Sequence, residues 1–129
     1  MRIDHVACEV ADLDASVRFY VERLGFVESW QHRNEEEGEA CAFLKLGDVY
    51  LELLAKLDGS FTSSAAVPPY CPHLALAVED LDASAEALVR QGVPILRGPL
   101  EVPGEVRWLY FADPDHNVIE YVQWIKRSW

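Results

Sequence analysis

The 129-residue sequence has little positive charge. Its 11 Lys and Arg residues stand against 22 Asp and Glu residues, which gives a formal net charge of −11 at pH 7. A surface of this sign repels phosphate groups, so neither nucleic acid nor an anionic membrane is expected as a partner. The one acidic run, residues 35–37, is expected to form a solvated loop.

Long apolar segments and a cysteine framework are also missing. No apolar stretch approaches the roughly 20 residues that span a bilayer, and the N-terminal segment has no signal-peptide apolar region. The three cysteines, Cys8, Cys41 and Cys71, form no CxxC pair. Each lies among apolar residues and is interpreted as a small buried side chain. These features together predict a cytoplasmic protein.

The sequence does contain a repeat of itself. The segment Asp-Leu-Asp-Ala-Ser occurs at residues 12–16 and again, 68 positions later, at residues 80–84. A repeated unit that cannot bury its apolar face alone is expected to pack against its copy. In this register, with no gap, three further pairs align: His5 with His73, Phe43 with Phe111, and Glu52 with Glu120.

Apolar periodicity predicts the same elements in each copy, namely a strand, a helix and three strands. The first helix is predicted to begin at the N-cap residue Asp12 and to end at Gly25. The second is predicted over residues 81–91. The predicted strands are residues 3–10, 26–31, 40–46 and 49–54 in the first copy, and 73–79, 95–96, 105–112 and 117–124 in the second.

The fold class is therefore predicted as α+β, with two tandem βαβββ modules related by a pseudo-twofold axis and forming a cleft-shaped mixed sheet. Residues 1–129 are expected to be one domain, the usual size for a single core. Module 1 is assigned to residues 1–55 and module 2 to residues 71–129. A linker rich in Gly, Ser and Pro, residues 56–70, joins them.

Two histidines and two glutamates at matched repeat positions are candidate metal ligands. Glu52 and Glu120 each interrupt an otherwise apolar strand, and a buried carboxylate needs a cation or hydrogen bonds to compensate it. His5 and His73 precede apolar strands at the same repeat phase. If the modules pack about a twofold axis, the four side chains converge on a site suited to Zn, Ni, Co, Mn or Fe.

These features, with the final motif Phe-Ala-Asp-Pro-Asp-His-Asn-Val-Ile-Glu at residues 111–120, resemble the vicinal oxygen chelate superfamily. That superfamily includes glyoxalase I, extradiol dioxygenases and bleomycin resistance proteins, and the resemblance covers essentially the whole chain. It implies that His5, Glu52, His73 and Glu120 are metal ligands. It also implies a homodimer whose active site lies at the interface, with two ligands from each chain.

Two residues depart from the family pattern. His116 stands where the usual turn has glycine, a position that can require a positive φ. Glu9 stands near the position where similar bacterial glyoxalase I enzymes carry an arginine that helps to hold the carboxylate of glutathione. A carboxylate at Glu9 would repel that group, which disfavours a glutathione conjugate as the substrate.

The favoured interpretation is a divalent-metal-dependent lyase or isomerase of the glyoxalase I type. It would promote proton transfer next to a carbonyl in a small oxygenated substrate, with Glu120 as the preferred base and Glu52 as the alternative. One alternative is an extradiol-type dioxygenase, although Glu52 would occupy a position that its metal leaves free. Another is a binding or resistance protein of the same fold.

Four more residues are candidate substrate contacts. Arg107 is predicted to share a strand face with Leu109 and Phe111, either as an anion clamp near Glu120 or as a charge at the rim. The four substrate candidates are Phe43, Arg107, Trp108 and Phe111.

Trp124 and Trp129 are interpreted instead as packing or dimer contacts.

Overall fold

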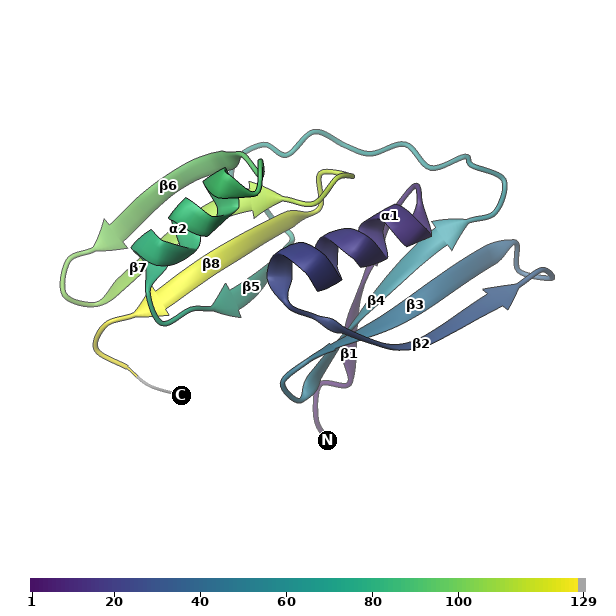
Figure 1. Ribbon diagram of the computed structural model, residues 1–129, viewed down its shortest axis with the longest axis horizontal. Coiled ribbons are helices and arrows are strands. Elements are labelled where there is room, and N and C mark those ends of the chain that lie inside the picture. The colour runs from purple at the N-terminus through teal and green to yellow at the C-terminus, as the bar shows by residue number, and fades with distance from the viewer. Residues whose placement is uncertain (128–129) are drawn as a thin grey trace. The chain divides into compact units, whose positions relative to one another are not determined.

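The computed structural model describes residues 1–127, and the chain divides into two compact units. The first is Met1–Ser64, and the second begins at Ala65. Each unit contains a four-stranded sheet and one main helix (Figure 1). Trp129, interpreted above as a packing or dimer contact, lies outside the described residues.

The first unit has the predicted order of a strand, a helix and three strands. Its sheet has the order β1-β4-β3-β2, with β1 parallel to β4 and the other pairs antiparallel. The elements are β1 (His5–Glu9), α1 (Leu13–Arg18), the π-helical turn η1 (Phe19–Arg23), β2 (Val27–Asn34), β3 (Glu39–Leu46) and β4 (Val49–Lys56).

The second unit repeats this topology. Its sheet has the order β5-β8-β7-β6, again with one parallel pair, β5 with β8. The fold class predicted from the sequence, α+β with two tandem modules, is confirmed, and each module forms its own mixed sheet. The elements are β5 (His73–Ala77), α2 (Leu81–Arg90), β6 (Ile95–Val102), β7 (Val106–Ala112) and β8 (Val118–Trp124).

Both helices begin at the repeated aspartate. The carboxylate of Asp12 accepts a hydrogen bond from the Ala15 backbone N–H at 3.0 Å, and Asp80 accepts one from Ala83 at the same distance. Each bond satisfies a backbone N–H that has no partner within its helix. Gly25, with φ +81°, follows the first helical segment as predicted. Neither helix, nor any other helical segment within residues 1–127, is long and apolar enough to cross a membrane.

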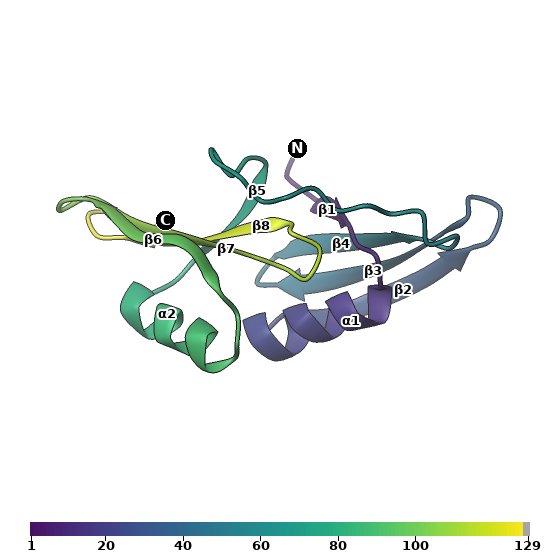
Figure 2. The same ribbon diagram turned by 90° about the horizontal axis from the view of Figure 1, so that it is seen from above.

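Alternation along the strands gives each sheet one buried face and one open face. In the first unit the buried face packs against α1 and carries Leu44, Leu51 and Leu53. In the second unit Leu109, Phe111 and Ile119 are fully buried in the same way, and α2 contributes Leu81 and Leu88 to that core. Figure 2 shows the helix of each unit on one face of its own sheet. The opposite face carries the candidate ligands.

The strand predicted at residues 95–96 is much longer in the structure, because β6 runs to Val102. Its pairing with β7 shifts between Ile95 and Arg97 and again between Arg97 and Leu100. Gly98 lies in the second irregular stretch with φ +109°, and a Cβ there would come within 2.9 Å of the Leu109 Cα. The predicted strand ended at Leu96, whereas Gly98 and Pro99 lie at a bulge within the observed strand.

Candidate metal centre

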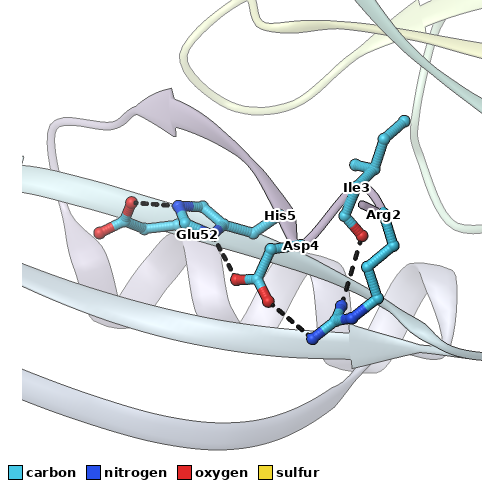
Figure 3. A network of polar contacts seen from close by, with 5 residues as sticks. All are labelled: Arg2, Ile3, Asp4, His5 and Glu52. Carbon is cyan, nitrogen blue, oxygen red and sulfur yellow. Dashed lines mark hydrogen bonds and ion pairs between the residues drawn. The ribbon is translucent and has the colours of Figure 1, made fainter.

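In the first unit, His5 and Glu52 face each other from adjacent strands. The parallel pairing of β1 with β4 places both side chains on the open face of the sheet. The His5 Nε2 atom lies 3.5 Å from Glu52 Oε1. On the other side of the ring, His5 Nδ1 lies 2.8 Å from Asp4 Oδ2 (Figure 3). The imidazole is thus held between two carboxylates.

Asp4 is itself held by a second contact. Its Oδ1 atom accepts a hydrogen bond from Arg2 Nη2 at 3.0 Å, so Arg2, Asp4, His5 and Glu52 form a continuous chain of polar contacts (Figure 3). The hydrogen bond with His5 is the largest cause that lowers the pKa of Asp4, and the charge of Arg2 adds to it. Asp4 is therefore ionised at neutral pH and acts as a hydrogen-bond acceptor.

In the second unit, His73 and Glu120 form the matching pair. The His73 Nε2 atom lies 2.8 Å from Glu120 Oε2, and its Nδ1 atom lies 2.9 Å from the Tyr70 carbonyl oxygen. Because a carbonyl only accepts, Nδ1 must carry the hydrogen. Tyr70 has φ +60°, an uncommon value for a residue with a side chain. That backbone conformation accompanies the contact between its carbonyl and His73.

This arrangement suits a divalent cation. In both pairs Nδ1 faces an oxygen acceptor and Nε2 faces a glutamate oxygen, so a neutral ring with its hydrogen at Nδ1 has its Nε2 lone pair directed at the glutamate. A lone pair facing a carboxylate is favourable only with a proton or a cation between them. Nitrogen and carboxylate oxygen are ligands that Zn and its first-row neighbours accept. The chemistry and orientation of the donors therefore fit the predicted metal.

Each unit by itself brings together two of the four candidate ligands. Among residues 1–127, no three or more His, Cys, Asp or Glu side chains gather closely enough to hold a metal ion. The structure thus brings His5 to Glu52 and His73 to Glu120. The prediction that all four hold one ion stays a prediction.

The sequence repeat fails by one residue at β7. Phe43 lies opposite Glu52 in the pairing of β3 with β4, but the residue opposite Glu120 is Tyr110. The first hairpin turns through residues 47–48, whereas the second uses residues 113–117, and this longer turn shifts β7 by one residue. A one-residue shift moves every side chain of a strand to the other face.

Two predicted substrate contacts are therefore wrong. Phe111 is fully buried in the core, in edge contact with Tyr121, on the face opposite Glu120. Arg107 is on that same face, where its guanidinium makes two hydrogen bonds to Asp82 of α2, at 2.9 and 3.1 Å. These bonds are the main cause that lowers the pKa of Asp82 and raises that of Arg107. Arg107 anchors the helix, and it does not lie beside Glu120.

Aromatic rings surround the ligand pair of the first unit. Phe43 packs edge-on against His5, with ring centroids 5.1 Å apart, and Trp30 lies 5.7 Å from Phe43. Trp30 and His32 are stacked almost parallel at 5.5 Å, and Trp30 is 54% exposed. Phe43 thus lies next to the His5–Glu52 pair, and its role as a substrate contact stays a prediction. Trp30 was not among the predicted site residues, although its position opposite Phe43 follows once the strand register is known.

In the second unit, different aromatic residues lie around the His73–Glu120 pair. Tyr110 lies 5.6 Å from His73 and stacks on Tyr70 at 4.9 Å, measured between ring centroids. Trp108 lies on the same face, because it is two residues from Tyr110 along β7. Sequence reasoning missed Tyr110 and Tyr70. The signal for Tyr110 was the length of the turn before β8, which sets the register.

The structure also shows the surroundings of Cys41, Glu9 and His116, three residues considered in the sequence analysis. Burial, followed by the charge of Glu52, raises the pKa of the Cys41 thiol, so this cysteine stays protonated. The carboxylate of Glu9 lies 3.4 Å from Lys56 Nζ, on the same face as Glu52. His116 has φ +65°, which confirms that the position occupied by glycine in the family requires a positive φ.

The fold and the two ligand pairs together define a class of small α+β proteins built from paired βαβββ modules. A family profile described as the Glyoxalase/Bleomycin resistance protein/Dioxygenase superfamily matches residues 2–121. The chain therefore belongs to this superfamily.

Comparison with individual proteins gives the same fold with differing functions. The chain is 30% identical to a probable lactoylglutathione lyase of Vibrio cholerae, over 95% of this chain and 90% of that protein. A glyoxalase family protein from Enterococcus faecalis has a TM-score of 0.78 and 28% identity, over 94% of this chain and 96% of that one. An antibiotic binding protein from Streptomyces has a TM-score of 0.73 and 26% identity, over 96% of both chains.

Proposed function

We propose that the protein is a divalent-metal-dependent lyase or isomerase that transfers a proton at a carbon next to a carbonyl in a small oxygenated substrate. The observation that carries this proposal is the pair of His–Glu contacts. In each, Nδ1 meets an oxygen acceptor and Nε2 is turned to a glutamate. His5, Glu52, His73 and Glu120 would hold the ion, with two ligands from each chain of a homodimer.

The ion would supply electrophilic assistance. When bound, a divalent ion polarises substrate oxygens and stabilises the negative charge that develops on them. The histidines would serve as neutral ligands, with Nδ1 in contact with Asp4 in one and with the Tyr70 carbonyl in the other. The glutamates compensate the positive charge, and one of them accepts the proton from the substrate carbon.

Either glutamate can be that base. The sequence favoured Glu120 because Arg107 was expected to anchor an anionic substrate beside it. Arg107 instead binds Asp82 on the opposite face of the sheet, which removes the basis of that preference. The side chains of Glu52 and Glu120 are similarly accessible, at 20% and 15% exposed. Substituting Glu52 and Glu120 separately would identify which of them is the base.

The surroundings of the pairs favour a substrate without a large anionic group. Phe43 and Trp108 lie on the open faces and remain the candidate substrate contacts. Lys56 lies on the Glu52 face, but its Nζ already contacts Glu9. A glutathione conjugate is therefore disfavoured, in line with the charge at Glu9.

The test combines metal binding with hydrogen exchange. Purified protein would be loaded with Zn, Ni, Co, Mn or Fe, and the bound metal measured per chain. Each form would then be incubated in deuterated water with α-hydroxycarbonyl compounds and with the hemithioacetal of methylglyoxal and glutathione. We expect metal-dependent deuterium uptake at the α-carbon of an uncharged hydroxycarbonyl compound. Exchange that is equally fast after complete metal removal would contradict the mechanism.

A second candidate function is the binding of a planar molecule without chemistry. The exposed, parallel stack of Trp30 on His32 favours it, since such a surface accepts a further ring. The likeness to a Streptomyces antibiotic binding protein is consistent with this use of the fold. A planar ligand that binds to metal-free protein, and that shows no exchange or turnover when metal is added, would favour this function.

A further inference from the structure

The two modules hold their histidines with different acceptors. His5 Nδ1 lies 2.8 Å from a carboxylate, Asp4 Oδ2, whereas His73 Nδ1 lies 2.9 Å from a backbone carbonyl, Tyr70 O. The repeat explains the difference, because the residue that aligns with Asp4 is Pro72, which has no acceptor in its side chain. The second module therefore recruits a main-chain oxygen three residues before its histidine.

The acceptor determines which ring nitrogen is free. A neutral imidazole carries one hydrogen, and an oxygen acceptor at Nδ1 retains that hydrogen there. The Nε2 atom is then a bare lone pair, which in His5 points at Glu52 Oε1 from 3.5 Å. If the hydrogen were at Nε2 instead, the Nδ1 lone pair would face Asp4 Oδ2 across 2.8 Å, a shorter and more repulsive contact between acceptors than the 3.5 Å from Nε2 to Glu52 Oε1.

We propose that Asp4 is a positioning residue for His5. Its carboxylate holds the Nδ1–H tautomer and the ring orientation that aim Nε2 at Glu52, and its negative charge makes His5 a stronger electron donor than His73. Arg2 supports this role, because its hydrogen bond to Asp4 Oδ1 directs the other oxygen, Oδ2, at the ring (Figure 3). The effect on the tautomer is independent of any metal. The effect on metal affinity rests on the proposed function.

The tautomer can be measured directly on the metal-free, full-length protein. Nitrogen NMR of the histidine rings, at about pH 8.5 and thus above the range where histidine ordinarily titrates, distinguishes Nδ1–H from Nε2–H. We expect His5 to be Nδ1–H in the wild type and to shift toward Nε2–H in Asp4→Ala. Asp4→Asn should shift the tautomer less than Asp4→Ala, because its amide oxygen can still accept from Nδ1–H, although its NH2 group can also donate to a bare Nδ1. His73 serves as an internal control that none of these variants should change.

A charge-matched control separates the contact from general electrostatics. Glu36→Ala removes the same charge from an exposed turn and should leave both rings unchanged. The proposal is overturned if Asp4→Ala keeps the wild-type His5 tautomer, or if Glu36→Ala shifts it equally. Circular dichroism of each variant establishes that the fold is retained, and His73 signals at wild-type positions confirm it locally.

Metal affinity gives the second readout. Loss of a side chain that orients a metal-bound histidine typically weakens metal binding by about 10–100-fold. Because the Asp4 side chain is 63% exposed, we expect the lower end of this range, about tenfold. Competition with a chelator should show this loss in Asp4→Ala, a smaller loss in Asp4→Asn and none in Glu36→Ala. If wild-type protein binds no divalent metal, the proposed function is wrong. The role of Asp4 in setting the His5 tautomer is still tested by the NMR measurement, which needs no metal.

Discussion

Tyr110 lies directly opposite Glu120 in the antiparallel pairing of β7 with β8, on the face of the sheet that carries His73. Its ring contacts both His73 and Tyr70. Phe111, the next residue, is on the other face and is fully buried. The two neighbours therefore have separate roles, one beside the candidate ligands and one in the core.

Substitution of these neighbours should have opposite consequences. Phe111→Ala leaves a cavity in the core of the second unit and is expected to lower the free energy of unfolding by about 3–5 kcal/mol. Tyr110→Ala should cost clearly less stability, because this ring is partly exposed, but it should perturb the His73 ring signals in NMR. Denaturant unfolding of both variants measures the first effect. Equal losses of stability, with His73 unperturbed in both, would show that the register is wrong.

Each ligand glutamate should be needed for metal binding but not for folding. Loss of a residue that merely supports a ligand costs about 10–100-fold in affinity, so Glu52→Gln and Glu120→Gln should weaken binding at least as much. Both side chains are partly exposed, and the amide has nearly the same shape. Chelator competition gives the affinity and circular dichroism the fold. Glu36→Gln in the exposed turn is the matched control and should bind metal like the wild type.

The sequence predicted the helices and strands because they depend on short-range pattern, whereas the four candidate ligands came from the 68-residue repeat. The aspartate N-caps follow from local chemistry, and so does the glycine after the first helical segment. The contact of His5 with Glu52, and of His73 with Glu120, follows from the parallel register of β1 with β4 and of β5 with β8, which the structure supplies. A carboxylate in an otherwise apolar strand was the signal that singled out Glu52 and Glu120, because burial of a charge requires compensation.

The errors arose where a turn length decides which face a residue occupies. Phe111 was expected near the candidate ligands because the 68-residue offset aligns it with Phe43, but the longer turn at residues 113–117 shifts β7 by one residue. Arg107 was expected near Glu120 because it lies in the neighbouring strand, but its side chain is on the opposite face. The contacts of Asp4 and Tyr70 with the histidines could not be read from spacing at all. They depend on side-chain orientation at Asp4 and on a positive φ at Tyr70.

The ion pair between Arg107 and Asp82 should make stability depend on pH. Its hydrogen bonds lower the pKa of Asp82 in the folded state below the ordinary carboxyl value of 3.8. A lowered folded pKa stabilises the protein above the ordinary value, and this contribution is lost as the pH falls through the folded value. Asp82→Asn should therefore lower the denaturation midpoint at neutral pH, with the difference from wild type shrinking below pH 3.8.

Asp14 provides the matched control for this experiment. It occupies the same first-turn position in α1 that Asp82 occupies in α2, and Asp14→Asn therefore removes the same favourable charge near a helix N-terminus. The loss in Asp82→Asn should exceed that in Asp14→Asn, and added salt should reduce the difference. Equal losses would mean that the helix end, and not Arg107, accounts for the effect of Asp82.

Substitution of Trp30 should weaken ligand binding more than it destabilises the fold. Its side chain is 54% exposed and stacked on His32, so Trp30→Ala is expected to leave the unfolding midpoint nearly unchanged. Stacking on an aromatic side chain contributes about 0.5–1.5 kcal/mol, so the affinity for a planar ligand should fall by roughly 2–10-fold. Trp30→Phe should retain most of that affinity. Calorimetric titration with planar and with aliphatic hydroxycarbonyl compounds would reveal the difference, which should be confined to the planar compounds.

A mixing experiment tests whether the metal site is shared between chains. Glu52→Gln and Glu120→Gln impair different modules, so each homodimer should have two defective sites. If every site combines the first module of one chain with the second module of the other, a mixed dimer has one site with both substitutions and one intact site. Random exchange of subunits should then restore about a quarter of the wild-type number of sites, because half of the dimers are mixed.

The recovered sites should bind metal with wild-type affinity and should restore α-carbon deuterium exchange in the same proportion. If both modules of a site belong to the same chain, every chain in the mixture still carries a defect, and no recovery is expected. Sedimentation of the same samples establishes whether the chains are dimers. Recovery without dimers, or dimers without recovery, would contradict the shared site while leaving the contacts within each His–Glu pair as they are.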